Sequence, residues 1–177
     1  MVAKKIINKN QIAKLKFVAK FLVILNLLSI PLYLAIYANF SFQPLQNFIA
    51  TISNSILQSS GYDSNQQDNL IVISGKNLLL RVDVSWDSTG WKSLYALTAL
   101  AIATPVVANK KIRFLAVALP AIFVINILRI VTTVAVSVSY GYEYFELLHT
   151  LLWREGLITA VVVIWAIWAY KQKYNIR

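Results

Sequence analysis

Four long blocks of apolar residues dominate this sequence, and blocks of this kind are typical of helices that cross a lipid bilayer. They cover residues 17–38, 90–108, 114–139 and 156–170. A spanning helix needs about 20 predominantly apolar residues. The hydrophobic fraction of 58% also exceeds the roughly 45–50% that is usual in soluble domains. We therefore predict an all-α polytopic membrane protein with about four transmembrane helices, forming a single integral membrane domain over residues 1–177.

The charged residues are divided unevenly between the connections that join these predicted spans. Most of the 17 basic residues lie before the first span, between the second and third, or after the fourth. All seven acidic residues lie in the remaining connections. Because cytoplasmic loops are enriched in lysine and arginine, we predict a multi-pass plasma-membrane protein with both termini in the cytoplasm and segments 42–88 and 140–155 outside. The net charge of +10 is then a topology signal, and no nucleic-acid partner is expected.

The long outer segment contains an amphipathic pattern followed by a polar stretch. Apolar residues recur at helical spacing from Pro44 to Ser59, with Gln46 and Ser53 on the opposite face. This pattern predicts a helix that lies on the bilayer or against the bundle. The polar residues 59–68 are predicted to form a loop.

An alternating pattern then leads into the second span. The runs 70–74 and 78–85, separated by a turn that contains Gly75, predict a β-hairpin. The chain next reaches Asp87-Ser88-Thr89-Gly90, where the second span begins. An oxygen of Asp87, Ser88 or Thr89 is predicted to cap the new helix, because such oxygens accept the first unpaired N–H groups.

Three polar side chains are predicted to meet on the outer side of the membrane. Arg129 lies in the third span, about 24 Å along a helix from Arg113, which places it in the outer leaflet. An arginine inside a span is a functional-site hypothesis by default; the alternative is that it reaches the surface or pairs with an acid such as Asp87. His149, the only histidine, precedes the fourth span and could instead be a packing residue. With Ser88 at the same depth, a hydroxyl, a guanidinium and an imidazole form the parts of an acyl-transfer site.

The order of three short motifs is similar to that of a known family. Ser88-Thr89-Gly90 precedes one apolar helix, Asn126-Ile127-Leu128-Arg129-Ile130 lies within the next, and His149 precedes the last. This arrangement resembles the exosortase/archaeosortase family of membrane cysteine transpeptidases. The resemblance implies that Ser88 occupies the nucleophile position, with Arg129 as the essential arginine and His149 as the third catalytic residue. Asp87, Thr89, Gly90 and Asn126 are the supporting residues.

The same resemblance implies a substrate and a reaction. The substrates would be secreted surface proteins that end in a recognition motif, a spanning helix and a basic tail. Cleavage would occur outside the membrane, and the acyl group would pass to an amine, such as a lipid headgroup, or to water. No metal or nucleotide motif is present, so no cofactor is expected. The substrate helix is predicted to dock against spans two to four, where small residues allow close approach, unless these residues pack within the chain. The small residues are Ala99, Ala101, Ala103 and Thr104.

The chain departs from the family at the nucleophile, where cysteine is replaced by Ser88. A thiol beside cationic groups forms a thiolate, whereas a serine hydroxyl needs a well-oriented base. We interpret the chain as an inactive Cys→Ser form, and we favour an engineered substitution over a natural serine form or a pseudoenzyme. A noncatalytic membrane scaffold or assembly factor, and a natural serine peptidase, are the alternative functions.

Overall fold

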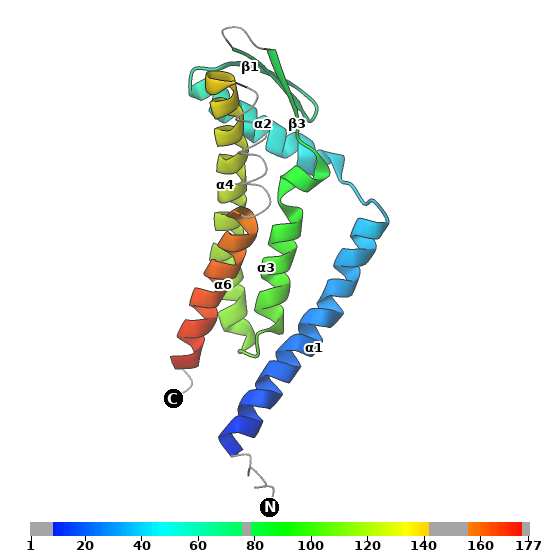
Figure 1. Ribbon diagram of the computed structural model, residues 1–177, viewed down its shortest axis with the longest axis vertical. Coiled ribbons are helices and arrows are strands. Elements are labelled where there is room, and N and C mark those ends of the chain that lie inside the picture. The colour runs from blue at the N-terminus through cyan, green and yellow to red at the C-terminus, as the bar shows by residue number, and fades with distance from the viewer. Residues whose placement is uncertain (1–8, 76–78, 142–155, 175–177) are drawn as a thin grey trace, which may run out of the picture.

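The computed structural model describes residues 9–75, 79–141 and 156–174. Figure 1 shows a bundle of helices that is capped at one end by a crossing helix and a small sheet. The bundle helices are α1 (Lys9–Tyr37), α3 (Trp91–Ala103), α4 (Ala108–Tyr140) and α6 (Leu157–Tyr174). The cap consists of α2 (Gln43–Ser59), β1 (Asp63–Gln67), β2 (Leu70–Ser74), β3 (Leu79–Asp83) and the 3₁₀-helix η1 (Trp86–Thr89).

Two helices in the described part of the chain are long and apolar enough to cross a membrane. They are Lys14–Tyr37 in α1 and Ala108–Tyr140 in α4, while α6 contributes a shorter apolar stretch. α3 has 13 residues, or about 20 Å, which is less than the roughly 30 Å of a hydrocarbon core. These apolar helices are consistent with a membrane protein. The four crossings and their orientation remain predictions.

The helix in the second predicted span ends earlier than the apolar run 90–108 suggests. Thr104 leaves the helix with φ −64° and ψ 122°, immediately before Pro105. A residue before proline avoids the helical region because the proline ring clashes with its backbone. The apolar residues that follow form the turn into α4, so hydrophobicity continues where the helix does not.

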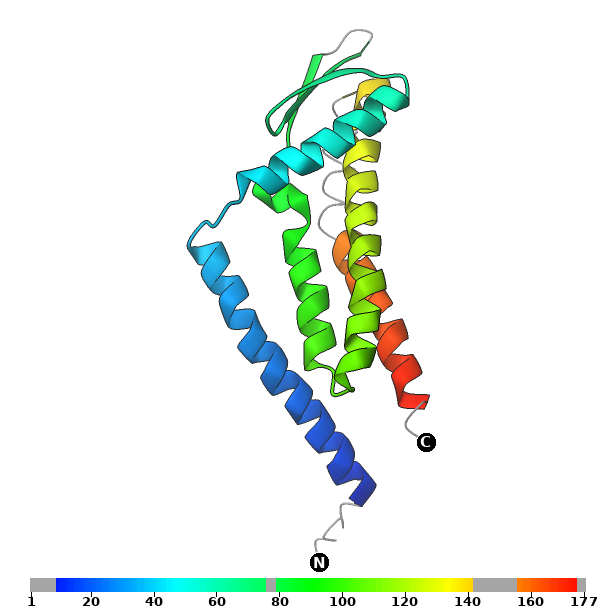
Figure 2. The same cartoon turned by 180° about the vertical axis from the view of Figure 1, so that it is seen from behind.

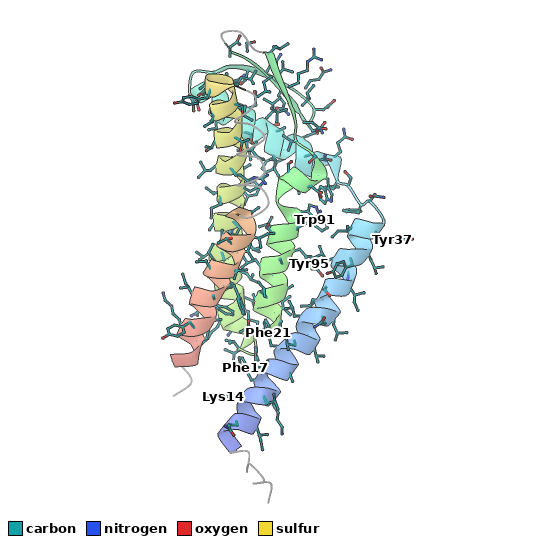
Figure 3. The ribbon with its side chains drawn as sticks, in the orientation of Figure 1. Lys14, Phe17, Phe21, Tyr37, Trp91 and Tyr95 are labelled. Carbon is teal, nitrogen blue, oxygen red and sulfur yellow. The ribbon has the colours of Figure 1, made fainter. Side chains whose placement is uncertain are left out.

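α3 lies at the centre of the bundle, with α1 on one side and α4 and α6 on the other (Figures 1 and 2). Its contact with α1 includes a hydrogen bond from the Tyr95 hydroxyl to the Leu28 carbonyl at 2.6 Å, and Figure 3 shows Tyr95 directed toward α1. Phe21 of α1 also stacks on Trp165 of α6, with 5.6 Å between ring centroids. The core of α3, α4 and α6 is built from Leu97, Ala118, Ile122, Leu157 and Val161.

The small residues of α3 pack within the chain and offer no outer surface to a substrate helix. Ala99, Ala101, Ala103 and Thr104 are all buried, and the Trp165 indole N–H donates to the Thr104 hydroxyl at 2.9 Å. Of the two alternatives given for these residues, packing within the chain is the one that the structure supports. Their small side chains allow α3 to pack closely against its neighbouring helices.

The predicted amphipathic helix is confirmed as α2, which lies across the end of the bundle between α4 and the sheet (Figure 1). One continuous core joins α2, the sheet and the outer half of α4. Gln46 and Ser53 were predicted on the outward face, and this was wrong, because they are only 8% and 0% exposed. α2 is covered on two sides, so its polar face is partly enclosed as well. The buried apolar residues of this core are Ile49, Ala50, Leu57, Ile71, Ile73, Leu80, Val82, Val84, Ile127, Ile130 and Val134.

The predicted hairpin is confirmed, and the sheet has one more strand than predicted. β2 and β3 pair antiparallel from Leu70↔Asp83 to Ser74↔Leu79. β1, in the segment predicted as a loop, pairs with β2 from Asp63↔Ser74 to Gln67↔Leu70. Every residue of β1 is polar, so no alternation indicated a strand, and backbone pairing alone defines it. The available signal was the two-residue turn Asp68-Asn69, since such turns favour Asn and Asp at positive φ and Asp68 has φ +54°.

The described acidic residues all lie at one end of the molecule, which also carries Arg81 and Lys92. Asp63 and Asp83 belong to the sheet, Asp68 to the turn between β1 and β2, and Asp87 to η1, whereas the first turns of α4 carry lysine and arginine at the opposite end. These basic residues are Lys110, Lys111 and Arg113. The remaining acids, Glu143, Glu146 and Glu155, lie outside the described residues.

Candidate functional site

The sheet and α2 fix the chain just before the candidate nucleophile. The Val84 N–H donates to the Asn69 carbonyl at 2.9 Å, and the Val84 carbonyl accepts from the side chain of Gln46 at 3.2 Å. The Gln46 oxygen in turn accepts from the Ser41 hydroxyl at 3.1 Å. The entry to η1 is therefore held from both the β1–β2 turn and α2. Sequence reasoning missed Gln46, because an amide on an amphipathic helix carries no sign of a backbone partner 38 residues away.

Removing the Gln46 side chain is expected to destabilise the fold. Gln46→Ala leaves the buried Val84 carbonyl with only a long 3.5 Å hydrogen bond from Asn69, and an unsatisfied buried polar group costs about 1–3 kcal/mol. The thermal unfolding midpoint of the purified protein measures this loss. Gln43→Ala, an exposed position on the same helix, is the matched control and should change the midpoint little. Equal midpoints for the two variants would contradict the role of Gln46.

The start of α3 differs in part from the predicted cap. Ser85 caps η1 by accepting the Ser88 N–H at 3.3 Å, and Gly90 is the N-cap of α3, with φ +76°. Of the three predicted capping residues, Thr89 accepts the Trp91 N–H, over a long 3.4 Å. The polar residues at this junction thus mainly shape the 3₁₀ turn, and glycine supplies the left-handed conformation from which α3 begins.

The backbone carbonyl of Ser88 is held by two side chains from α4. Asn126 donates from Nδ2 at 3.1 Å, and Arg129 donates from Nη2 at 3.1 Å. These residues share one face of α4 because they are three positions apart. The structure therefore brings Ser88, Asn126 and Arg129 together, as predicted, although their meeting point is the main chain of Ser88 and not its hydroxyl.

Gly90 makes close packing of this junction against α4 possible. A Cβ at Gly90 would lie 2.9 Å from the Cγ atom of Asn126, closer than real Cβ contacts allow. Asn126 is itself only 1% exposed. Glycine is required here for two independent reasons, a positive φ and the approach of the Asn126 amide. Thr89, also buried, donates its hydroxyl to the Trp86 carbonyl at 2.7 Å and completes the turn.

Arg129 retains a hydrogen-bonding group that no described residue satisfies. Its Nη1 atom is buried and has no hydrogen-bond partner among residues 9–75, 79–141 and 156–174, and the same holds for Oδ1 of Asn126. The alternative in which Arg129 pairs with Asp87 is not what the structure shows, because Asp87 forms a salt bridge with Lys92 at 2.8 Å. A guanidinium with a spare donor therefore lies beside the Ser88 main chain.

The hydroxyl of Ser88 has a neighbour that sequence reasoning missed. Ser85 Oγ lies 2.9 Å from Ser88 Oγ, three residues earlier in the same turn. A hydroxyl does not act as a base near neutral pH, so this contact orients the Ser88 side chain without activating it. His149, the third predicted member, lies outside the described residues, so its place relative to Ser88 stays a prediction.

A cavity of about 290 Å³ opens beside the turn, between η1 and the end of α1. Its wall includes Ser85, Trp86, Asp87 and Trp91 from the η1–α3 junction. The two indoles stack on each other, with 5.3 Å between ring centroids. This space lies at the η1–α3 junction, but neither Ser88 nor Arg129 lines it.

Comparison with known proteins assigns the chain to a family. The family model of the transmembrane exosortases matches residues 11–169, which include every described site residue. No curated protein and no solved structure matches the chain. The match extends over nearly the whole sequence, from the first bundle helix into the last. The chain therefore belongs to the transmembrane exosortase family.

Proposed function

We propose that this chain has the architecture of a membrane transpeptidase that cleaves a C-terminal sorting signal from secreted surface proteins, and that it is inactive because Ser88 stands at the nucleophile position. Exosortases are in general cysteine transpeptidases with a role in sorting. The observation that carries the proposal is the pair of hydrogen bonds from Asn126 and Arg129 to the Ser88 carbonyl. They bring two motifs that lie far apart in the sequence into contact, which supports one shared site.

The geometry supports a double role for Arg129 in acyl transfer. A thiolate at position 88 would attack the peptide carbonyl, form a thioester and release the amine of the C-terminal fragment. During this step the Nη2 atom would hold the turn, and the unpartnered Nη1 atom would donate to the oxyanion that develops on the substrate. His149 would protonate the leaving amine and later deprotonate the amine acceptor or water that attacks the thioester.

The distribution of charge supports the proposed orientation. The site lies at the acidic end of the bundle, beside Asp87 and the sheet, and the basic end lies beyond α3. Since basic residues mark the cytoplasmic side, the site would face the exterior, with α1, α3, α4 and α6 as the four spanning helices. The Ser88 turn contacts Arg129, which lies about 24 Å from Arg113 along α4, so η1 and Gly90 would lie in the outer leaflet, where a signal just outside the bilayer could reach them.

Restoring the thiol is the direct test. Ser88→Cys is expected to cleave a reporter that carries a sorting signal of motif, apolar helix and basic tail, and to form a thioester with it, whereas the parent chain does neither. Ser85→Cys is the matched control, because it places a thiol in the same turn but not on the residue whose carbonyl α4 holds. If Ser88→Cys neither cleaves the reporter nor forms a thioester with it, a noncatalytic scaffold is favoured instead. Phosphonate labelling of the parent chain that is lost in Ser88→Ala would favour a serine peptidase.

A second measurement on the same variant needs no substrate. The guanidinium of Arg129 is expected to lower the pKa of the thiol in Ser88→Cys below the usual value of about 8.5, because it stabilises the thiolate. The rate of alkylation by iodoacetamide at pH 7 should then exceed that of Ser85→Cys. Adding Arg129→Met should return the rate to that of an ordinary thiol. Alkylation rates that do not depend on Arg129 would contradict the electrostatic role.

A further inference from the structure

A groove of about 520 Å³ lies between α4 and α6 at the end of the bundle away from the sheet. We call it the α4–α6 groove and define it by Lys110, Arg113, Val117, Ala121, Ile164 and Trp168. Phe114 stacks on Trp168 at one wall, with 4.3 Å between ring centroids and 13° between ring planes. The groove lies in a different part of the molecule from the candidate site at η1.

The mouth of the groove carries two cations without a described counter-charge. Lys110 and Arg113 are three residues apart in the first turns of α4 and therefore share one face. The salt bridge found among the described residues joins Asp87 and Lys92 at the other end of the bundle. Every described acidic residue lies at that other end. An anionic ligand would therefore neutralise the positive charge at the mouth of the groove.

The rest of the groove is apolar and exposed. Val117 and Ala121 follow Arg113 by one and two turns of α4, about 12 Å along the helix in all, and Ile164 faces them from α6. Val117 is 73% exposed on a helix long and apolar enough to span a membrane, so in a bilayer its side chain would face lipid. A ligand that fills the groove therefore has an anionic group at the helix end and an apolar chain toward the middle of the bundle.

We propose that the α4–α6 groove binds an anionic glycerophospholipid, with its phosphate between Lys110 and Arg113 and an acyl chain along Val117 and Ala121. Basic pockets between transmembrane helices bind anionic headgroups in this way. A second copy of the chain is the rival occupant. In the same membrane orientation that copy would present its own basic end at the same depth, and the like charges would repel. Charge complementarity therefore favours an anionic lipid over a second copy of the chain.

The test uses the full chain in detergent, with phosphatidylglycerol and phosphatidylcholine of equal chain length as probes and native mass spectrometry as the readout. The unaltered chain should retain phosphatidylglycerol in preference to phosphatidylcholine. Lys110→Gln with Arg113→Gln should weaken retention of phosphatidylglycerol by about 30-fold. Lys14→Gln with Lys16→Gln removes the same charge from exposed positions of α1, where Lys14 is seen in Figure 3, and should leave retention unchanged.

Two further variants separate charge from shape. Ala121→Trp fills the apolar part without changing the charge and should also weaken retention, whereas Lys110→Arg with Arg113→Lys should preserve it. If the double glutamine variant does not fold, Ala121→Trp and the lysine–arginine exchange still test the proposal. Equal retention of the two lipids by the unaltered chain, or equal losses in both glutamine pairs, would overturn the proposal. A lipid-free dimer that Ala121→Trp dissociates would show that a second copy fills the groove instead.

Discussion

Replacing Arg129 with methionine in the Ser88→Cys chain is expected to lower the rate of cleavage at least a hundredfold without lowering the thermal unfolding midpoint. The loss of rate follows because a preorganised donor to an oxyanion contributes about 10²–10³ in kcat. The midpoint is maintained because the Ser88 carbonyl keeps its hydrogen bond from Asn126. Arg129 also has no acidic partner among the described residues, and a half-buried charge without a partner stabilises a fold little.

The lysine variant tests the double role assigned to the guanidinium. Arg129→Lys keeps the positive charge but replaces a planar fork of donors with a single ammonium. It cannot hold the turn and reach the oxyanion with separate nitrogen atoms, so the cleavage rate should fall nearly as far as in Arg129→Met. Arg81→Met, at an exposed position of β3, serves as the control and should leave both rate and midpoint unchanged. A parallel fall of rate and midpoint in the Arg129 variants would indicate a structural role instead.

Gly90→Ala is expected to lower the free energy of unfolding by about 2–3 kcal/mol. An L-residue in the left-handed conformation costs roughly 1–2 kcal/mol, and Gly90 has φ +76°. The added methyl group would also lie 2.9 Å from Asn126 Cγ. Moving the amide away breaks its hydrogen bond to Ser88, which costs about a further 1 kcal/mol. Thermal or denaturant unfolding in detergent measures the total.

The chain contains a matched control for this substitution. Gly61 also has a positive φ of +88°, but nothing lies within 4 Å of the position of its Cβ. Gly61→Ala therefore reports the conformational cost alone, and the difference from Gly90→Ala reports the cost of the clash. In an Asn126→Ala background the clash disappears, so Gly90→Ala should cost no more than Gly61→Ala, and the two effects should be non-additive. Additive effects would mean that Gly90 and Asn126 do not interact.

The parts of the fold that were predicted correctly rest on hydrophobic pattern. Apolar periodicity indicated α2 and the β2–β3 hairpin because burial of one face determines both elements. β1 was missed because backbone pairing forms it from polar residues. The end of α3 was misplaced because hydrophobicity continues through Pro105 into the turn, while backbone geometry does not.

The candidate site was predictable as a set of residues but not as a geometry. Depth along the helices placed Arg129 and Asn126 near Ser88, and the hydrogen bonds confirm that proximity. The atom they bind is a main-chain carbonyl, which every residue possesses and which no sequence pattern can distinguish. The roles of Gln46 and Ser85 could not be predicted for the same reason, since they depend on contacts made only after the chain has folded.

Recognition of a main-chain oxygen by α4 has a practical consequence. Because Asn126 and Arg129 bind the carbonyl of residue 88 and not its side chain, the turn keeps its shape whether that side chain ends in sulfur or in oxygen. The present chain should then bind a substrate with nearly the affinity of an active enzyme and hold it without turnover. Such a stalled complex would be a direct route to seeing how a sorting signal enters this fold.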